Sequence, residues 1–212
     1  MNDIQASVRS RRRPDGPPAG VLALITLAAT IASVIAHAND SDRWQGVFVF
    51  AASVPLGIYA ATMYARLLRL GIRVPGPNIS FFGGMTASIL GAASGLVSWA
   101  QSRADALPVV VDHLMTDIGF ALGGVGMVGG LGLLIAGIAV PSIILRLVPR
   151  WLAWSGLVLA VIGEVSFLAL VWSGFDALLP IARFVGLIWL AIVGFRLPRS
   201  RHDVPARWSR RA

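Results

Sequence analysis

Three ionisable side chains lie inside apolar stretches of the second half of the chain. Glu164 interrupts the stretch 152–172, Arg183 interrupts the stretch 177–195, and Asp117 begins a glycine-rich apolar stretch upstream of both. Charge in hydrocarbon costs roughly 3 kcal/mol per residue, so such side chains normally face the protein interior and find a partner. The helical rise of about 1.5 Å per residue places all three roughly 8 to 12 Å from the same end of their helices. We therefore predict a buried cluster in which Arg183 bridges Glu164 and Asp117.

The faces on which these charges lie support the same prediction. Arg183 shares a helical face with Gly186 and Gly194, and Glu164 shares one with Ala160. Small residues mark packed faces of membrane helices, so both charges should point into the bundle. Two roles remain open for the cluster. It can fix the register of the helices, as buried ion pairs often do, or it can line a pathway for protons or a solute.

Histidine supplies a second, more distant chemical possibility. His37 and His113 are predicted at the outer ends of their helices, and His113 follows Asp112. Two facing histidines could ligate a haem iron, and a histidine beside a carboxylate could bind a metal ion. Two histidines form no ligand signature, so we predict neither a metal nor a cofactor.

No sequence motif for catalysis or nucleotide binding stands in a suitable context. The chain has no G-x-S-x-G elbow, no H-E-x-x-H and no P-loop lysine. The run 124–129 matches G-x-G-x-x-G, but it lies inside an apolar stretch with no strand before it, which favours helix packing. There is no cysteine, which excludes disulfides and thiolate metal sites. We expect no catalytic residue and lean away from an enzyme.

The elements that must position these side chains are membrane spans. Charged residues make up 13% of the 212 residues, whereas a soluble domain has about 25%. The apolar residues come in blocks, and blocks of about 20 residues cross a bilayer. The sequence predicts an all-α integral membrane protein, a bundle of six transmembrane helices at about 20–36, 46–68, 79–100, 117–140, 152–172 and 177–195.

This assignment divides the chain into three parts. Residues 1–19 form a disordered basic tail, residues 20–196 form the membrane domain, and residues 197–212 form a second basic tail. The first span ends in Ala36-His37-Ala38, which resembles a signal-peptide cleavage site, so it is either cleaved or kept as an anchor.

The positions of the charges orient the helices. The formal net charge is +8, and all eighteen basic residues are arginine. The basic gaps alternate with acidic ones, as the positive-inside rule requires, so both termini should be cytoplasmic. We expect the basic parts to contact an anionic cytoplasmic leaflet, and we expect no nucleic-acid partner. The basic gaps hold Arg66, Arg69, Arg73, Arg146 and Arg150, and the opposite gaps hold Asp40, Asp42, Asp105 and Asp176.

Small residues at four-residue intervals predict close helix contacts. This spacing lets two helix backbones approach each other. The contacts can form inside the bundle, with another membrane protein or with a second copy of the chain. The residues are Gly83, Ala87, Gly91 and Gly95 in one span, and Gly119, Gly123, Gly126 and Gly130 in the next.

The last third of the chain carries a family resemblance. The residues that carry it are Pro149-Arg150-Trp151-Leu152 with Gly156, Leu179-Pro180, Gly186-Leu187-Ile188-Trp189-Leu190 and Gly194-Phe195. On these positions the chain resembles a bacterial family of six-helix membrane proteins known as domain of unknown function 4386. The resemblance implies a six-helix protein of the bacterial inner membrane, and it supplies no activity or catalytic residue. Many members have an acidic residue near the position where this chain has Arg183.

These observations favour a structural or interaction subunit of the cell envelope. The alternative is a small transporter or proton-coupled carrier that uses Asp117, Glu164 and Arg183. A haem- or metal-binding membrane protein is a more distant alternative. A water-accessible cavity at Glu164 would favour the carrier, and a dry, packed environment would favour the structural role.

Overall fold

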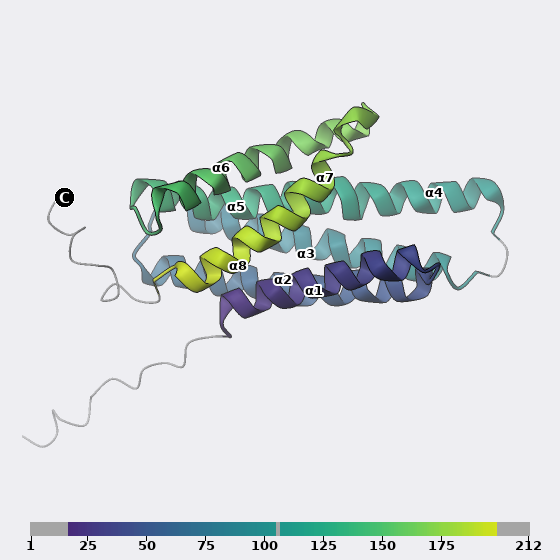
Figure 1. Cartoon of the computed structure of the whole chain (residues 1–212), viewed down its shortest axis with the longest axis horizontal. Coiled ribbons are helices and arrows are strands. Elements are labelled where there is room, and N and C mark those ends of the chain that lie inside the picture. The colour runs from purple at the N-terminus through teal and green to yellow at the C-terminus, as the bar shows by residue number, and fades with distance from the viewer. Residues whose placement is uncertain (1–16, 105–106, 199–212) are drawn as a thin grey trace, which may run out of the picture.

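The computed structural model describes residues 17–104 and 107–198, and these residues form helices and short connections without a β-strand (Figure 1). The predicted tails 1–19 and 197–212 lie almost entirely outside the described residues. The α-helices are α1 (Ala19–Ala38), α2 (Asp42–Arg69), α3 (Gly76–Gln101), α4 (Val109–Phe120), α5 (Met127–Ile144), α6 (Arg150–Val165), α7 (Leu178–Pro180) and α8 (Gly186–Arg196). Four shorter turns of other helix types join them: η1 (Ala121–Gly126), η2 (Ser166–Leu170), η3 (Ser173–Phe175) and η4 (Ile181–Val185).

Together these elements make six continuous units, each long and apolar enough to cross a membrane. Helices α1, α2 and α3 are single units, whereas Val109–Ile144, Arg150–Leu170 and Ser173–Arg196 are composite. The predicted all-helical architecture is confirmed, and the six long apolar units are compatible with the six predicted spans.

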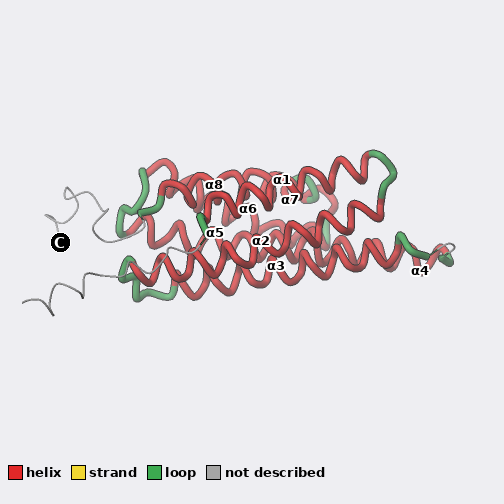
Figure 2. The backbone as a smooth tube through the Cα atoms, turned by 90° about the horizontal axis from the view of Figure 1, so that it is seen from below, coloured by secondary structure: helices red, strands yellow, loops and turns green. Residues whose placement is uncertain are grey.

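The fourth unit is longer than the predicted span 117–140, because the apolar residues 107–111, which the sequence allowed either to extend this span or to lie along the interface, extend it from Val109. It begins at Val109 instead of Asp117 and has 36 residues, which corresponds to about 54 Å of helix. The hydrocarbon core of a bilayer is about 30 Å thick. Helix α4 accordingly projects beyond the neighbouring turn between α6 and α7, and it has no buried residue (Figures 1 and 2).

Proline marks the start of several helices. Pro18, Pro108 and Pro149 are the N-cap residues of α1, α4 and α6. Proline suits these places because the first amide groups of a helix have no intrahelical acceptor. Pro55 and Pro141 lie instead inside α2 and α5.

The helices pack in a closed circuit. Helix α1 packs against α2, α2 against α3, α3 against α5 and α5 against α6. Helix α8 then packs against α1. The main core includes Tyr59, Leu131 and Leu190, all fully buried. A smaller core joins Val125 and Ala182 with Val128, Ala169 and Leu179, where the α6–α7 turn meets η1.

Glycine brings the backbones of α3 and α5 into contact. A Cβ atom on Gly130 would lie 2.6 Å from the backbone nitrogen of Ala87, and one on Gly83 would lie 2.5 Å from that of Leu134. Further along the same stripe of α3, Gly95 packs in the same way on α2. The predicted close contacts therefore form within this chain, and they occupy most of the α3 glycine face.

Two stretches wind as π-helices, η1 and η4. At the first, the Ser94 hydroxyl of α3 donates a 2.9 Å hydrogen bond to the carbonyl oxygen of Gly119, and the Ser94 side chain lies where a Cβ on Gly123 would be. A side chain that inserts between turns in this way interrupts the regular helical hydrogen bonds and shifts the helix phase.

The two ends of the bundle differ in charge. Helix α1 begins at the same end at which α8 finishes (Figure 1). We call this the basic end; it holds Arg66, Arg69, Arg73, Arg146, Arg150 and Arg196. The opposite, acidic end holds Asp40, Asp42, Asp112 and Asp176 together with Arg43 and Arg103.

Candidate functional site

Arg183 lies in the π-helix η4, next to the smaller core. Its Nε and Nη2 atoms are buried and have no hydrogen-bond partner. A buried guanidinium without a partner is unfavourable, because the group has lost its water and gained nothing in return. Such a group in a folded protein requires an explanation.

Glu164 lies on the flank of α6 that faces α5, and its side chain is exposed. The carboxylate extends over Gly132, where a Cβ atom would lie 2.9 Å from Oε1 of Glu164. The adjacent Gly163 packs directly on the Gly132 backbone, so α5 and α6 cross at this point. Ala160 and Ala153 on the same side of α6 are buried, as expected, but Glu164 lies at the edge of that stripe.

The predicted ion-paired cluster does not form. Among the described residues, Arg183 makes no ion pair with Glu164 or Asp117. Helical phase explains the separation from Glu164. Ile162 packs against the core that contains Ala182, the neighbour of Arg183. Glu164 is two residues further along α6, about 200° around the helix, and therefore faces away from η4.

Depth explains the separation from Asp117. Leu179 packs against Gly124, at 3.7 Å from the place that a Cβ would occupy, so these two residues lie at one level. Arg183 is four residues from Leu179 toward the basic end, about 6 Å, and Asp117 is seven residues from Gly124 toward the acidic end, about 10 Å. The two charges are thus about 16 Å apart along the bundle. Asp117 is exposed on the projecting part of α4.

Asp112 takes part in a small polar contact at the acidic end. The Gln101 side-chain amide donates hydrogen bonds to Oδ1 of Asp112 at 2.7 Å and to Oγ1 of Thr116 at 3.2 Å. These bonds join the end of α3 to the first turns of α4. Asp112 therefore helps to hold the start of α4 against the end of α3.

The histidines do not form a shared site. His37 Nδ1 lies 3.5 Å from Oδ1 of Asp42, and both side chains are exposed. His113 is exposed on α4. No group of three His, Asp or Glu side chains gathers among the described residues in a way that could hold a metal ion.

Sequence reasoning missed a polar clamp between α2 and α8. The Tyr59 hydroxyl donates a 2.9 Å hydrogen bond to the carbonyl oxygen of Leu190, and Nη1 of Arg66 donates one of 2.8 Å to that of Gly194. Tyr59 is fully buried and Arg66 is 5% exposed. A cation near a helix C-terminus satisfies its unpaired carbonyl groups and its dipole. The seven-residue spacing of the two side chains is the only sequence signal for this clamp.

A second clamp joins α6 to α8. Nε1 of Trp189 donates a 2.8 Å hydrogen bond to the carbonyl oxygen of Leu152, and the indole ring covers Gly156. These residues belong to two of the segments that carry the family resemblance. Their contact gives these positions a packing role.

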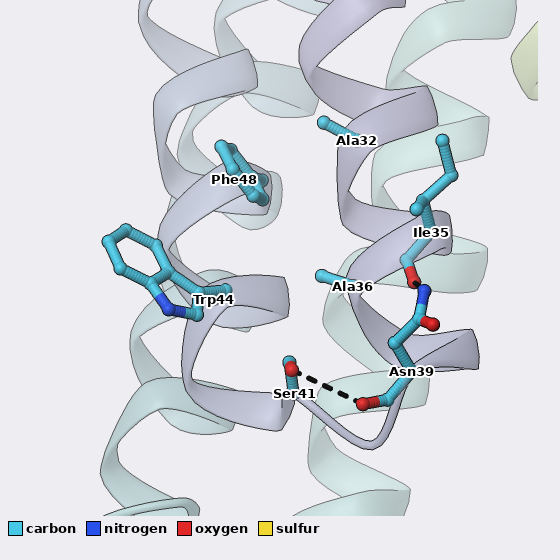
Figure 3. A pocket seen from close by; sticks show the side chains of 7 residues that line it. All are labelled: Ala32, Ile35, Ala36, Asn39, Ser41, Trp44 and Phe48. Atoms are coloured by element: carbon cyan, nitrogen blue, oxygen red, sulfur yellow. Dashed lines mark hydrogen bonds between the residues drawn. The ribbon is translucent and has the colours of Figure 1, made fainter.

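Two hollows lie away from Glu164 and Arg183. A groove of about 500 Å³ runs between the end of α1 and the start of α2, lined by Ala32, Ile35, Ala36, Asn39, Ser41, Trp44 and Phe48 (Figure 3). A smaller hollow of about 270 Å³ lies at the basic end between α5 and α6, lined by Ser142, Ile143, Arg146, Val148, Arg150, Ala153 and Trp154. We call the second one the basic pocket. Neither includes Glu164 or Arg183.

Comparison with known proteins gives no match: no family model, no curated protein and no solved structure is similar to this chain.

Proposed function

We propose that the chain is a multi-pass protein of the bacterial cytoplasmic membrane, with its basic end on the cytoplasmic side. Six helices long and apolar enough to span a bilayer support this placement. The concentration of arginine at one end supports the orientation, because cytoplasmic loops carry the excess of basic residues.

Within that membrane we propose that the protein is an interaction subunit, which binds a transmembrane helix of another protein along the exposed face of α6. The observation that carries this proposal is Glu164, an exposed ionisable residue in the middle of an apolar helical unit. Glu164 is fourteen residues from Arg150, or about 21 Å, and six from Leu170, or about 9 Å. It therefore falls within the hydrocarbon layer.

Contact with lipid acyl chains is energetically unfavourable for the Glu164 side chain. A carboxylate in contact with acyl chains costs about 3 kcal/mol, and a hydrogen-bond donor on a partner helix would offset that cost. The face beside Glu164 is otherwise apolar, with Trp154, Val158 and Val161 each more than half exposed. An apolar face with one carboxylate suits a helix that carries an Arg, Lys, Asn or Gln at the level of Glu164.

Glu164 lies away from both hollows described above. Neither the groove beside Trp44 nor the basic pocket reaches Glu164. The carboxylate lies on the outside of the helix pair α5–α6, where a second protein can reach it.

Crosslinking in the native membrane tests the proposal. A photoreactive amino acid at Val161 is expected to give a protein adduct, whereas the same probe at Ile25, an exposed residue of α1, gives lipid adducts only. Glu164→Leu should abolish the protein adduct, and Glu164→Gln should retain part of it, because an amide still forms hydrogen bonds. The crosslinked peptide should be a transmembrane segment with a hydrogen-bond donor.

Two results would contradict the proposal. One is an adduct yield at Val161 equal to that at Ile25. The other is an adduct that is unchanged by Glu164→Leu at equal protein level.

Arg183 favours a second candidate, a small carrier for anions or protons. Its buried, unpartnered Nε and Nη2 atoms lie in a π-helix, a feature that is frequent at functional sites. A mobile anion could supply the missing hydrogen bonds during transport.

Flux through reconstituted vesicles tests this candidate. If the protein is a carrier, pH-gradient-driven proton flux or chloride flux exceeds that of protein-free vesicles, and Glu164→Gln or Arg183→Gln lowers it. Flux equal to that of the empty vesicles eliminates the carrier for these ions.

A further inference from the structure

The basic pocket at the ends of α5 and α6 combines two arginines with an apolar wall. Arg146 and Arg150 line it together with the buried Ala153 and Val148 and the exposed Trp154. Charge beside apolar surface distinguishes this hollow from the groove at the acidic end, which has no charged residue.

The backbone places Arg146 at the pocket in a conformation that arginine rarely adopts. Its φ is 52°, in the left-handed region. Helix α5 ends at Ile144, and the amide of Leu147 returns a 3.2 Å hydrogen bond to the carbonyl oxygen of Ser142. Glycine is the usual residue at this position of such a helix end. An arginine is found here instead, and its side chain lines the pocket.

Arg150 also lines the pocket, and it lies at the start of the next helix. Pro149 is the extended N-cap of α6, with ψ 142°, and Arg150 is the first helical residue. The amides of Leu152 and Ala153 bond to the carbonyl oxygen of Pro149. The N-terminal end of a helix carries partial positive charge, so it adds to the field of the two arginines.

We propose that the basic pocket binds the phosphate headgroup of an acidic glycerophospholipid, with the phosphate between Arg146 and Arg150. Two arginines offer charge-assisted hydrogen bonds to phosphate oxygens. The exposed Trp154 of the lining, together with the exposed Ile144 and Trp151 that are next to lining residues in the chain, provides the surface along which the acyl chains lie. Basic pockets between transmembrane helices on the cytoplasmic side bind such lipids.

The apolar surroundings favour a lipid over a soluble phosphate. A soluble anion gains nothing from the exposed indole of Trp154, whereas a lipid buries apolar surface there. The inference depends on the proposed placement in a membrane, but it does not depend on a partner at α6.

Titration of the full-length protein in neutral detergent tests the site. The probes are dioctanoyl phosphatidylglycerol, dioctanoyl phosphatidylcholine and inorganic phosphate, with intrinsic tryptophan fluorescence or native mass spectrometry as the readout. Phosphatidylglycerol should bind saturably and at least about tenfold more tightly than either other probe, because the choline cation of phosphatidylcholine is repelled by the two arginines and inorganic phosphate has no acyl chains to bury.

Three variants distinguish lipid binding in the pocket from attraction of the lipid to basic surface in general. Arg146→Gly and Arg150→Gln should each weaken phosphatidylglycerol binding about tenfold, whereas Arg73→Gln, at the same end but outside the pocket lining, should change it little. Arg146→Gly is the most informative variant, because glycine suits the left-handed backbone. Its melting temperature should therefore equal or exceed that of the wild type while its lipid binding falls.

Three outcomes overturn the proposal. The first is equal weakening by Arg73→Gln and the pocket variants, which indicates surface attraction alone. The second is equal affinity for phosphatidylcholine. The third is inorganic phosphate that binds as tightly as phosphatidylglycerol, which indicates a soluble-anion site.

Discussion

Replacement of Arg183 by leucine should make the isolated protein more stable. The Nε and Nη2 atoms of Arg183 are buried without partners, so the folded state carries their desolvation cost. Arg66 provides the matched control. It is also buried, but its Nη1 donates to the carbonyl oxygen of Gly194, and Arg66→Leu should therefore have the opposite effect.

The two magnitudes follow from the same contacts. Each unsatisfied buried donor costs about 1–3 kcal/mol, so Arg183→Leu removes about 2–6 kcal/mol of penalty. The shorter leucine leaves part of the space empty, which costs about 1–3 kcal/mol. We expect a net gain of about 1–3 kcal/mol for Arg183→Leu. A hydrogen bond from a charged group contributes about 1.5–3 kcal/mol, so Arg66→Leu should lose about 2 kcal/mol.

Unfolding of the detergent-solubilised variants measures both values. Helical circular dichroism should follow denaturation by sodium dodecyl sulfate, with gel filtration of each variant to verify a monodisperse fold. The expected result is a higher midpoint for Arg183→Leu and a lower midpoint for Arg66→Leu. A midpoint for Arg183→Leu as low as that for Arg66→Leu would refute the reasoning, because it would mean that Arg183 has a stabilising partner.

Three further predictions concern the packing of the helices. Gly130→Ala should lower stability by about 1–3 kcal/mol, since its Cβ would lie 2.6 Å from the backbone nitrogen of Ala87. Gly129→Ala is the control, because nothing lies within 4 Å of its Cβ position, and it should be neutral or stabilising. Trp189→Phe should cost about 1 kcal/mol by loss of the hydrogen bond to Leu152, measured by the same unfolding assay. Gln101→Leu should speed amide hydrogen exchange in the first turns of α4 and leave exchange in α2 unchanged, because it removes the hydrogen bond to Asp112.

Much of the architecture was predictable from local sequence. The first span was predicted at 20–36 and is found at Ala19–Ala38, and the third was predicted at 79–100 and is found at Gly76–Gln101. Hydropathy and proline position depend on neighbouring residues in the chain, so a short window contains the information. The fourth helix was the exception. Its extension to Val109 crosses polar residues, among them Asp112, that a hydropathy window treats as its end.

Of the three charges predicted to be buried, only Arg183 has buried charged atoms, whereas Glu164 and Asp117 are exposed. Glu164 was expected to point into the bundle with Ala160, and it lies instead at the edge of that stripe of small residues. The predicted pairing of Arg183 with Glu164 was wrong because η4 packs on the Ile162 flank of α6, while Glu164 lies on the α5 flank. The choice of flank depends on which helices are neighbours, and no single helix contains that information.

Arg66 is a second residue whose contact could not be predicted from the sequence. As a sequence feature it belonged to a set of arginines that orient the bundle, and only the packing of α2 against α8 reveals that it caps the Gly194 carbonyl. The sequence alone determined the helices, their order and the distribution of charge between the two ends, because each of these depends on residues close together in the chain. Tertiary structure alone decided which glycine faces meet, which carbonyl receives each donor and which charges stay unpaired. Those outcomes depend on the mutual rotation and depth of helices that are distant in the chain, and one inserted residue in a π-helix is enough to change both.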